Sequence, residues 1–501
     1  MSTRRSFVAS SLAVAAVPLA TRAQSATPAA DLLPEIVIDL SGEPDNLTPA
    51  LSYSTRDWSV MHSIYDSLVD FAPDGQILPQ AAEVFESDDA ITFRVRLRAG
   101  MIFHDGSPVT TAAITRNVEH IKSADSQISD LYQVITEVRQ IDDLNAEIVC
   151  VEPSPWLPSQ LVVWGVLLPE GFTDESLASA PIGSGPYILE SWEQGSAITL
   201  VRNPDYHLGS PKGDPLAERV TYRFVPEAAT RVADLTTGLA HLIDAVPKDQ
   251  LGAVADGGNV AVSSPVLATA FIRIATDAAP FDEPRVCQAV NHAVDVQAIA
   301  DALVSTEAKR LASVFPDARG LGFDASLSPF AYDPEKAKEL LAEAGYADGF
   351  VTEAQITATS RTDVLEAVAE QLAAVGIKVN IVTSELATFN QDWSNTDAPA
   401  LRYASWRPMY DPFTFVNLLV NSEGYLSRYS NPTADELIRS AAIEPATESR
   451  DAIYQELGRT LQDQPGFIYL WNLVTNVGVS SQIEGWSPRG DDYVLALRRT
   501  Q

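Results

Sequence analysis

The sequence predicts an α/β protein with two lobes and a cleft between them. Segments with the patterns of strands and of helices alternate along the chain, which is typical of α/β proteins. The chain has 501 residues, more than one hydrophobic core usually holds. Its 46% hydrophobic and 20% charged residues are those of an ordinary globular protein. We therefore expect mostly parallel pairing in at least one sheet, and a ligand site in the cleft.

Individual elements follow from local patterns. Apolar or alternating runs predict strands at residues 36–40, 91–97, 198–202, 220–225, near 243, 271–275, 377–382, 467–470 and 474–479. Helical spacing of apolar residues predicts helices at residues 110–121, 229–242, 284–294, 333–345, 362–375, 431–442 and 450–462. Thr110, Asp282 and Asp333 are expected to cap three of these helices, and Gly345 and Gly376 to end two of them.

The first 23 residues have the pattern of a signal peptide. Arg4 and Arg5 form a charged start, residues 7–20 are mostly apolar, and cleavage is expected before Gln24. Residues 3–8 resemble the twin-arginine export signal, and a Sec signal that contains two arginines is the alternative. The apolar stretch is too short to anchor the protein in a membrane. We therefore expect export, followed by release of a mature chain.

The net charge and the cysteine content exclude some classes of binding partner and a lipid anchor. The formal net charge is -33, and nucleic acids and anionic membranes attract basic surfaces, so neither is an expected partner. The two cysteines, Cys150 and Cys287, lie far from the signal, so no cysteine there can carry a lipid anchor. An oxidising compartment allows one disulfide, but two buried free thiols are the simpler expectation. We expect a soluble monomer.

Motifs of catalysis and metal binding are absent from the sequence. There is no P-loop, no HExxH and no Cys-rich zinc spacing. Ser184 lies in a Gly-Ser-Gly-Pro run, but Ile182 stands where the nucleophile elbow of a serine hydrolase needs glycine. Gly183 and Gly185 are expected to permit a tight backbone bend. The scattered histidines are expected to be ordinary core or surface side chains: His62, His104, His120, His207, His241 and His292. We expect no cofactor, no metal and no catalysis.

Five segments resemble blocks of the peptide/nickel family of extracellular solute-binding proteins, and they follow one another in the family's order. The first two contain FHDGSPVT and the pair PIGSGPYIL and VRNPDYHLGSP. The others contain PFD, YDPEKA, and WRPMYDP followed by YSNP. Joint occurrence in order is more specific than any single block, so the chain is identified as a member of this family over about residues 35–480.

The resemblance implies a bilobed periplasmic-binding-protein fold with two α/β lobes, a small extra subdomain and a hinge. Lobe one is expected to comprise residues 34–268 and 474–501, with the extra subdomain at about 70–180, and lobe two residues 269–473. The strands near Phe271 and Leu473 are then the hinge crossings. A ligand that contacts both lobes stabilises the closed state, which a permease can recognise.

The resemblance also implies where the ligand binds. In the family the loop that here reads Trp406-Arg407-Pro408-Met409-Tyr410-Asp411-Pro412 faces the cleft. Trp406 and Tyr410 offer flat faces for stacking, and Arg407 can pair with a ligand carboxylate. Many peptide-binding members carry an aspartate that pairs with the peptide amino group, at the position of Met409. Asp411 is the residue that can compensate for its absence.

Lobe one is expected to contribute to the same site. Tyr53 and Arg56 lie in the early loop that borders the cleft in the family, although residues in such a loop are also often simply exposed. Trp164 and Phe389 are further aromatic candidates, but aromatic residues lie more often in the core than in a pocket.

The predicted function is that of a periplasmic receptor, which captures a short peptide or amino-acid-derived solute and delivers it to ABC permease subunits in the inner membrane. Nickel or another metal chelate is the alternative, because nickel-binding members share residues that correspond to Trp406 and Tyr410. Gly424 stands where their ligand histidine would be, and their pocket arginines do not carry over. A secreted hydrolase on a similar scaffold is the least favoured reading.

Overall fold

The computed structural model describes residues 32–124, 126–207, 210–358, 360–393, 395–406 and 411–498. The predicted signal peptide lies outside these residues. Residues from Leu33 onward form one unit, and the fold given below is the fold of that unit.

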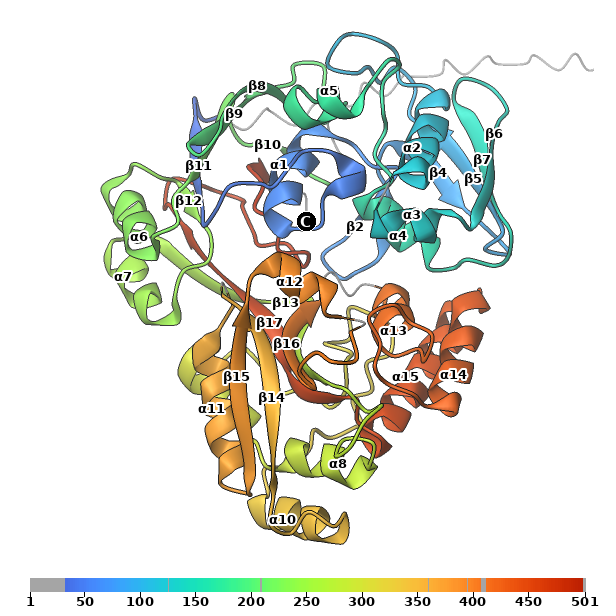
Figure 1. The fold of residues 1–501 in the computed structure, drawn as a ribbon. Helices are drawn as coiled ribbons and strands as arrows, with labels where there is room; N and C mark the ends of the chain where they lie inside the picture. The colour runs from blue at the N-terminus through green and yellow to red at the C-terminus, as the bar shows by residue number, and fades with distance from the viewer. Residues whose placement is uncertain are drawn as a thin grey trace, which may run out of the picture. The chain divides into compact units, whose positions relative to one another are not determined.

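Ten strands form one mixed sheet in the order β15-β14-β16-β13-β17-β12-β1-β11-β9-β8. In that order they are Ile377–Ser384, Phe350–Thr357, Leu401–Trp406, Val260–Ile274, Phe467–Val479, Leu242–Ile243, Ile36–Leu40, Arg219–Phe224, Ala197–Arg202 and Tyr187–Glu193. Figure 1 shows β13 and β17 running between the group β14, β15 and β16 and the group that contains β1, β9 and β11.

The prediction of mostly parallel pairing is wrong for this sheet. β1 pairs in parallel with β11 and β12, and β14 pairs in parallel with β15 and β16. The other neighbours are antiparallel. The physical reason is that the chain leaves one strand group along β13 and returns along β17, so the two long strands run in opposite directions. β8 and β9 add an antiparallel hairpin at the edge.

β13 and β17 are longer than the sequence predicted. The pattern indicated residues 271–275 for the first and two separate strands for the second, whereas β13 has 15 residues and β17 has 13. Polar residues and Pro265 interrupt the apolar runs, which is why local patterns split these strands. The register between them shifts between Pro265 and Thr269 and again between Thr269 and Phe271.

A separate four-stranded antiparallel sheet lies in the region expected for the extra subdomain. Its order is β4-β5-β7-β6, formed by Ala82–Glu86, Thr92–Leu97, Asn145–Cys150 and Ile135–Gln140. Phe93, Val95 and Leu97 are buried and alternate with exposed arginines, as predicted for β5. Small two-stranded sheets pair β2 (Val69–Phe71) with β3 (Ile77–Pro79), and β10 (Asp214–Pro215) with β18 (Leu497–Arg498).

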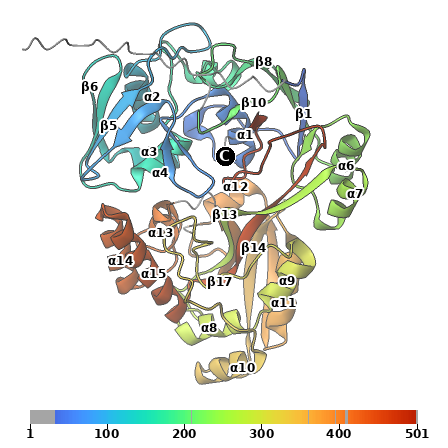
Figure 2. The same ribbon diagram turned by 180° about the vertical axis from the view of Figure 1, so that it is seen from behind.

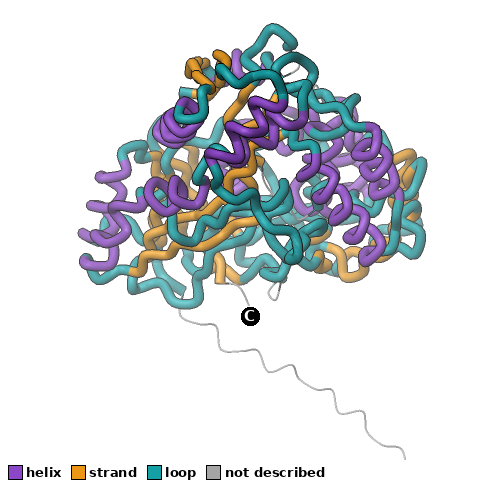
Figure 3. Tube along the Cα trace, turned by 90° about the horizontal axis from the view of Figure 1, so that it is seen from below, coloured by secondary structure: helices purple, strands orange, loops and turns teal. Residues whose placement is uncertain are grey.

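Helices flank these sheets, and Figure 3 shows strands running between them. They are α1 (Thr55–Ile64), α2 (Ala112–Ser123), α3 (Gln127–Tyr132), α4 (Leu157–Val163), α5 (Asp174–Ser179), α6 (Ala228–Thr237), α7 (Leu251–Asp256), α8 (Pro284–His292), α9 (Val296–Ile299), α10 (Pro334–Glu343), α11 (Thr362–Ala373), α12 (Leu386–Gln391), α13 (Phe413–Leu419), α14 (Pro432–Ile443) and α15 (Thr447–Asp463). Short 3-10 turns occupy Pro49–Leu51 and Lys248–Gln250, and a π-helical turn occupies Ala300–Val304. Seen from behind, α9 and α11 lie next to each other (Figure 2), and α11 packs on β15.

Several helix ends differ from the prediction. α6 ends at Thr237, because Gly238 adopts a left-handed conformation with φ 77°. Glu283, not Asp282, caps α8 by accepting a hydrogen bond from the Arg285 amide. Thr111 rather than Thr110 precedes α2. The cap at Asp333 is confirmed, since its Oδ1 accepts from the Lys336 amide at 2.9 Å.

The buried apolar residues fall into separate cores. One core surrounds the four-stranded sheet, and a second surrounds β1, β9 and β11 with the C-terminal segment. Two more cover β14 to β17 and helices α8 to α15. Cys150 and Cys287 lie in different cores as free, buried thiols, and burial raises the pKa of the Cys150 thiol to about 11. In the part of the chain that the structure describes, no helix is long and apolar enough to cross a membrane.

Candidate functional site

A cavity of about 2380 Å³ is lined by residues from both groups of strands. Its walls come from residues 40–59, 126–164 and 244–249 on one side, and from residues 357–363 and 386–426 on the other. Residues 302–304, 474–476 and 492–494 complete the lining. Typical ligand pockets have about 300–1,000 Å³, so this cavity has room for a solute of several residues and for water.

The structure brings three of the predicted site residues to this cavity. Trp406, Tyr53 and Arg56 all line it, although Trp406 lies about 350 residues after the other two in the sequence. Arg407 and Tyr410 lie outside the described residues. Asp411 is not among the lining residues.

Trp406 is the last residue of β16 and is held by the strand before it. It pairs with Thr269 of β13 in the antiparallel register. Its ring meets Phe415 edge-on at a centroid distance of 5.9 Å, and the residue is partly exposed. One side of the indole therefore packs against the core, while the residue also lines the cavity.

Arg56 and Tyr53 are placed by the start of α1. Ser54 and Asp57 form a capping box that fixes this first turn. The Arg56 guanidinium lies close to Gly42, where an added Cβ would come within 2.4 Å of Nη1, so a larger residue there would displace the end of the Arg56 side chain. In the described residues Arg56 has no ion-pair or hydrogen-bond partner. A cation that faces a cavity without a partner can receive a ligand carboxylate.

Asp411 is engaged elsewhere. Its Oδ1 accepts from Arg450 Nη2 at 2.8 Å and from the Phe413 amide at 2.9 Å. Its side chain is 7% exposed and that of Arg450 is 3% exposed. Burial lowers the pKa of Arg450, but the adjacent Asp411 charge raises it above the ordinary value overall. This ion pair ties the end of the cleft loop to α15.

Aromatic side chains from several segments line the cavity, and sequence reasoning missed most of them. They are Tyr53, Trp58, Trp156, Trp164, Phe389, Trp393, Tyr403, Trp406, Phe413, Tyr425 and Tyr493. Trp164 and Phe389, which the sequence suggested as weaker aromatic candidates, line the cavity and also pack against buried core residues. No sequence signal separates these residues from core residues, because a buried wall and a core have the same periodicity.

Two tryptophans are fixed by one carbonyl. Trp58 Nε1 donates to the Ser52 oxygen at 3.0 Å, and Trp164 Nε1 donates to the same oxygen at 3.2 Å. Their rings meet edge-on, with 6.4 Å between centroids. Because its indole N–H group is satisfied, the half-buried Trp164 can present apolar surface to a solute, whereas Trp58 is almost fully buried.

A partly buried carboxylate also lines the cavity. Asp244 accepts from the Ser41 amide at 2.7 Å and from the Ser41 hydroxyl at 3.0 Å. Burial raises its pKa to about 6, because desolvation outweighs the nearby Arg231 charge and the Ser41 hydrogen bonds. The Arg361 guanidinium, in contrast, is committed to Asp363, with Nε–Oδ1 at 2.8 Å.

Nothing in the described residues forms a metal site of three or more histidine, cysteine or carboxylate groups. At Gly424, where nickel-binding members have a histidine, an added Cβ would lie 2.5 Å from the Leu418 oxygen. This backbone contact leaves no room for a side chain at that position.

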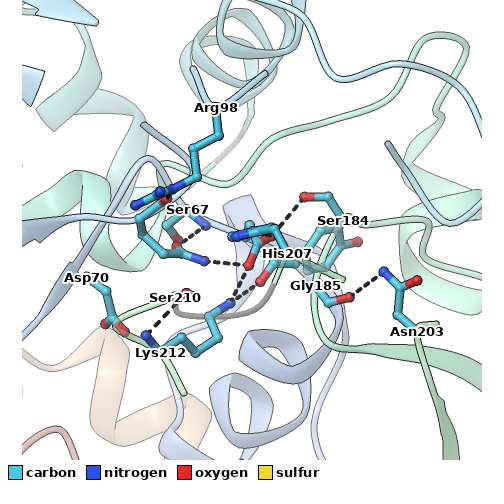
Figure 4. A network of polar contacts seen from close by, with 12 residues as sticks. Ser67, Asp70, Arg98, Ser184, Gly185, Asn203, His207, Ser210 and Lys212 are labelled. Atoms are coloured by element: carbon cyan, nitrogen blue, oxygen red, sulfur yellow. Dashed lines mark hydrogen bonds and ion pairs between the residues drawn. The ribbon is translucent and has the colours of Figure 1, made fainter. Parts of the chain in front are cut away.

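Ser184 belongs to a buried polar network and not to a catalytic triad. Figure 4 shows Ser184, His207 and Lys212 converging on one carboxylate, that of Asp66. Ser184 Oγ and His207 Nε2 both contact Asp66 Oδ2, at 3.3 and 3.0 Å. A triad instead places histidine between serine and aspartate. Burial would raise the pKa of Asp66, but the Lys212 and His207 charges lower it to about 2.

The glycines beside Ser184 allow close packing, and the expected bend lies at residues 184–186. At Gly183 an added Cβ would lie 2.1 Å from the Ile64 oxygen, and at Gly185 it would lie 2.6 Å from that oxygen. The Gly185 amide donates to the same carbonyl at 2.8 Å. This segment therefore packs directly on the C-terminal end of α1.

The sequence matches a known protein family and is similar to named binding proteins. Residues 76–427 match the model of the bacterial extracellular solute-binding proteins, family 5. The glutathione-binding protein GsiB of Salmonella paratyphi A is 29% identical over 361 residues, which cover 70% of each chain. The probable D,D-dipeptide-binding periplasmic protein DdpA of Escherichia coli is 25% identical over 477 residues, which cover 90% of this chain and 91% of that one.

A solved structure has the same fold. The periplasmic binding protein DppA of Helicobacter pylori, in complex with the peptide STSA, superimposes with a TM-score of 0.80. The match covers 93% of this chain and 97% of that one, at 21% identity. The bilobed α/β fold predicted from the sequence is confirmed by this likeness.

Proposed function

Since the chain belongs to family 5 of the bacterial extracellular solute-binding proteins, it is a solute-binding receptor, and we propose that its solute is a short peptide or an amino-acid-derived compound. The receptor delivers this solute, chemically unchanged, to the permease subunits of an ABC importer. The names of the relatives support this class, because they bind glutathione, a D,D-dipeptide or a peptide. The chain acts as a monomer in the periplasm, after export through its twin-arginine signal.

The observation that carries the proposal is the cavity itself. Aromatic side chains from both strand groups line it, and Arg56 faces it without a partner among the described residues. Aromatic walls suit the apolar parts and peptide planes of a solute, whereas a guanidinium suits its carboxylate. Peptides and amino-acid derivatives carry both features.

We infer that Trp406, Arg407, Tyr410, Tyr53 and Arg56 contact the solute. The first three lie on the cleft loop and the other two on the opposite wall. Asp411 acts on the solute through the loop, which its ion pair with Arg450 anchors.

We further infer that the lobes are residues 34–268 with 474–501 and residues 269–473, with the extra subdomain at about 70–180. The separate cores support this division. The register shifts between β13 and β17 support a hinge, because they fall beside residues 268 and 473. Backbone irregularity at that point lets the two strands bend together.

The deciding experiment is identification of the solute that co-purifies with the protein. Native mass spectrometry of protein from the periplasm is expected to detect a peptide or amino-acid derivative, and titration of refolded protein with that compound is expected to give a single tight site. A panel of di- to pentapeptides and opine-like compounds serves as the search set. Absence of binding across this set, with the protein folded, would contradict the proposed solute class.

A metal chelate is the alternative outcome of the same experiment. The described residues offer no cluster of metal ligands, so a metal would have to arrive inside a chelating solute. Elemental analysis of protein purified without chelators distinguishes the two cases. If the protein contains stoichiometric nickel that is released together with an organic chelator, the solute is a metal chelate and not a peptide.

A further inference from the structure

Two buried arginines face each other on neighbouring strands, behind the aromatic wall of the cavity. Arg273 of β13 lies directly opposite Arg402 of β16 in the antiparallel register. The two residues are 1% and 0% exposed. Directly opposite residues project from the same face of a sheet, with Cβ atoms about 4.5–5.5 Å apart. Two like charges are therefore held close together where water has little access.

Each of the two guanidinium groups has nitrogen atoms that no protein group accepts a hydrogen bond from. Arg402 Cζ lies 4.1 Å from the ring centre of Phe389 and 4.5 Å from that of Trp393, so aromatic rings cover its faces. Arg402 Nη2 donates to the Phe389 oxygen, and Arg273 Nη1 donates to the Trp393 oxygen at 2.9 Å. The other nitrogens, Nε and Nη1 of Arg402 and Nε and Nη2 of Arg273, are buried without a hydrogen-bond partner.

No carboxylate in the described residues forms an ion pair with either arginine. Asp277, which acts on Arg273, is itself paired with Arg428 at 2.8 Å, and Asp392, which accepts from Gln355 at 2.8 Å, acts on Arg402 only through space. Burial lowers the pKa of Arg273 to about 9 and that of Arg402 to about 10. Both values lie above neutrality, so both groups stay charged at pH 7, and buried charges without a counter-charge are strongly unfavourable.

We propose that Arg273 and Arg402 bind a small inorganic monoanion, such as chloride, between the edges of their guanidinium groups. Such an ion accepts the remaining N–H donors in the guanidinium planes and compensates one of the two charges. It must be small, because the free nitrogens are closed off from solvent. This site is distinct from the solute cavity, which Phe389 and Trp393 line but the two arginines do not.

The ion has a structural consequence for the cavity. Arg402 stacks on Phe389 and Trp393 and holds the Phe389 carbonyl, while Arg273 holds the Trp393 carbonyl. An ion that fixes both arginines therefore also fixes these two aromatic side chains, which form part of the wall that the solute meets.

The first test compares thermal unfolding of the purified chain in sodium chloride and in sodium gluconate at equal ionic strength. Gluconate is too large for the site, so chloride is expected to raise Tm by about 2–4 °C through binding to the folded state. Arg402→Met removes one charge and two free donors, and it is expected to abolish this difference. Arg439→Met is the matched control, because Arg439 is an exposed arginine paired with Glu436, and it is expected to keep the difference.

Bromide gives a second test that needs no variant. Crystals grown in sodium bromide are expected to show one anomalous peak between the guanidinium groups of Arg273 and Arg402. Water at that position, together with equal Tm values in chloride and gluconate, overturns the proposal. A peak that disappears when the transported solute is bound also overturns it, because the solute itself would then be the occupant.

Discussion

At the scale of single residues, Arg56 is the side chain whose role the structure defines most sharply. It faces the cavity, lies close to Gly42 and has no partner among the described residues. The sequence suggested it only through its place in an early loop. What could not be predicted is its lack of a partner, because that depends on residues far along the chain that fold beside it.

Arg56→Gln tests this role by removing the charge and the guanidinium fork while keeping a shorter polar side chain. Hydrogen bonds to charged groups contribute about 1.5–3 kcal/mol, so the affinity for a solute with a carboxylate is expected to fall about 10- to 100-fold. Titration calorimetry of the identified solute measures the change. Arg285→Gln removes an exposed arginine that is paired with Glu283, and it is expected to leave the affinity unchanged. If Arg56→Gln and Arg285→Gln bind the solute with equal affinity, Arg56 does not contact the solute.

Asp244 makes the stability of the protein depend on pH. Burial raises its pKa from 3.8 to about 6, so folding favours the protonated form. The stabilisation from this group is therefore complete below about pH 4 and is lost as the pH rises through 6. A shift of this size corresponds to about 3 kcal/mol.

Asp244→Asn keeps a neutral group that can still meet both Ser41 contacts. It is expected to match the wild type below pH 4 and to exceed its free energy of unfolding above pH 6. Denaturant unfolding at pH 4 and pH 8 measures the two differences. A pH dependence that is identical in both proteins would show that Asp244 titrates normally in the fold.

At the scale of secondary-structure elements, the sequence predicts positions better than lengths or partners. β1, β9, β11, β15, α10, α11 and α14 begin or end within two residues of the expected bounds. β17 was split into two strands because Asn472 interrupts its apolar run, although the strand continues through that residue. The antiparallel pairing of β13 with β17 was not predicted either, because no local sequence pattern indicates that two strands cross between the lobes in opposite directions.

The packing of residues 183–185 on α1 predicts a position-specific effect of adding one methyl group. Gly185→Ala would place Cβ 2.6 Å from backbone atoms of Ile64, and backbone cannot move aside as a flexible side chain can. The free energy of unfolding is expected to fall by about 2 kcal/mol or more. Denaturant unfolding measures it.

Gly252→Ala in α7 is the matched control for this substitution. An added Cβ there meets nothing within 4 Å, and alanine favours a helix over glycine by about 0.5–1 kcal/mol. This variant is expected to be neutral or slightly stabilised. If both variants lose a similar amount of unfolding free energy, the close approach of residues 183–185 to α1 is not the cause of the destabilisation.

At the scale of the whole molecule, the cavity wall includes contacts between residues that were assigned to different predicted lobes. Trp156, from the expected extra subdomain, stacks on Phe413, from the expected lobe two, with 4.2 Å between centroids and 11° between planes. Both residues line the cavity. The family resemblance predicted the two-lobe arrangement, but it could not predict this pair, because aromatic contacts between lobes depend on tertiary packing.

The Trp156–Phe413 stack joins two of the expected lobes, so we expect it to favour their closed arrangement. Phe413→Ala removes it and is expected to increase the radius of gyration of the free protein, while the solute-bound protein stays nearly as compact as the wild type. Because the solute must then also drive closure, its affinity is expected to fall about 2- to 10-fold, in line with the energy of one aromatic pair. Small-angle scattering and calorimetry on the same samples measure both effects.

Phe85→Ala is the control for this variant, because Phe85 stacks on Phe93 within the four-stranded sheet and spans no lobe boundary. It is expected to change neither scattering nor affinity. If Phe413→Ala leaves the free protein as compact as before and the affinity unchanged, the stack does not contribute to closure. A radius of gyration that stays constant on solute binding in every variant would further mean that the lobes do not move, and the register shifts between β13 and β17 would then be static features of the sheet.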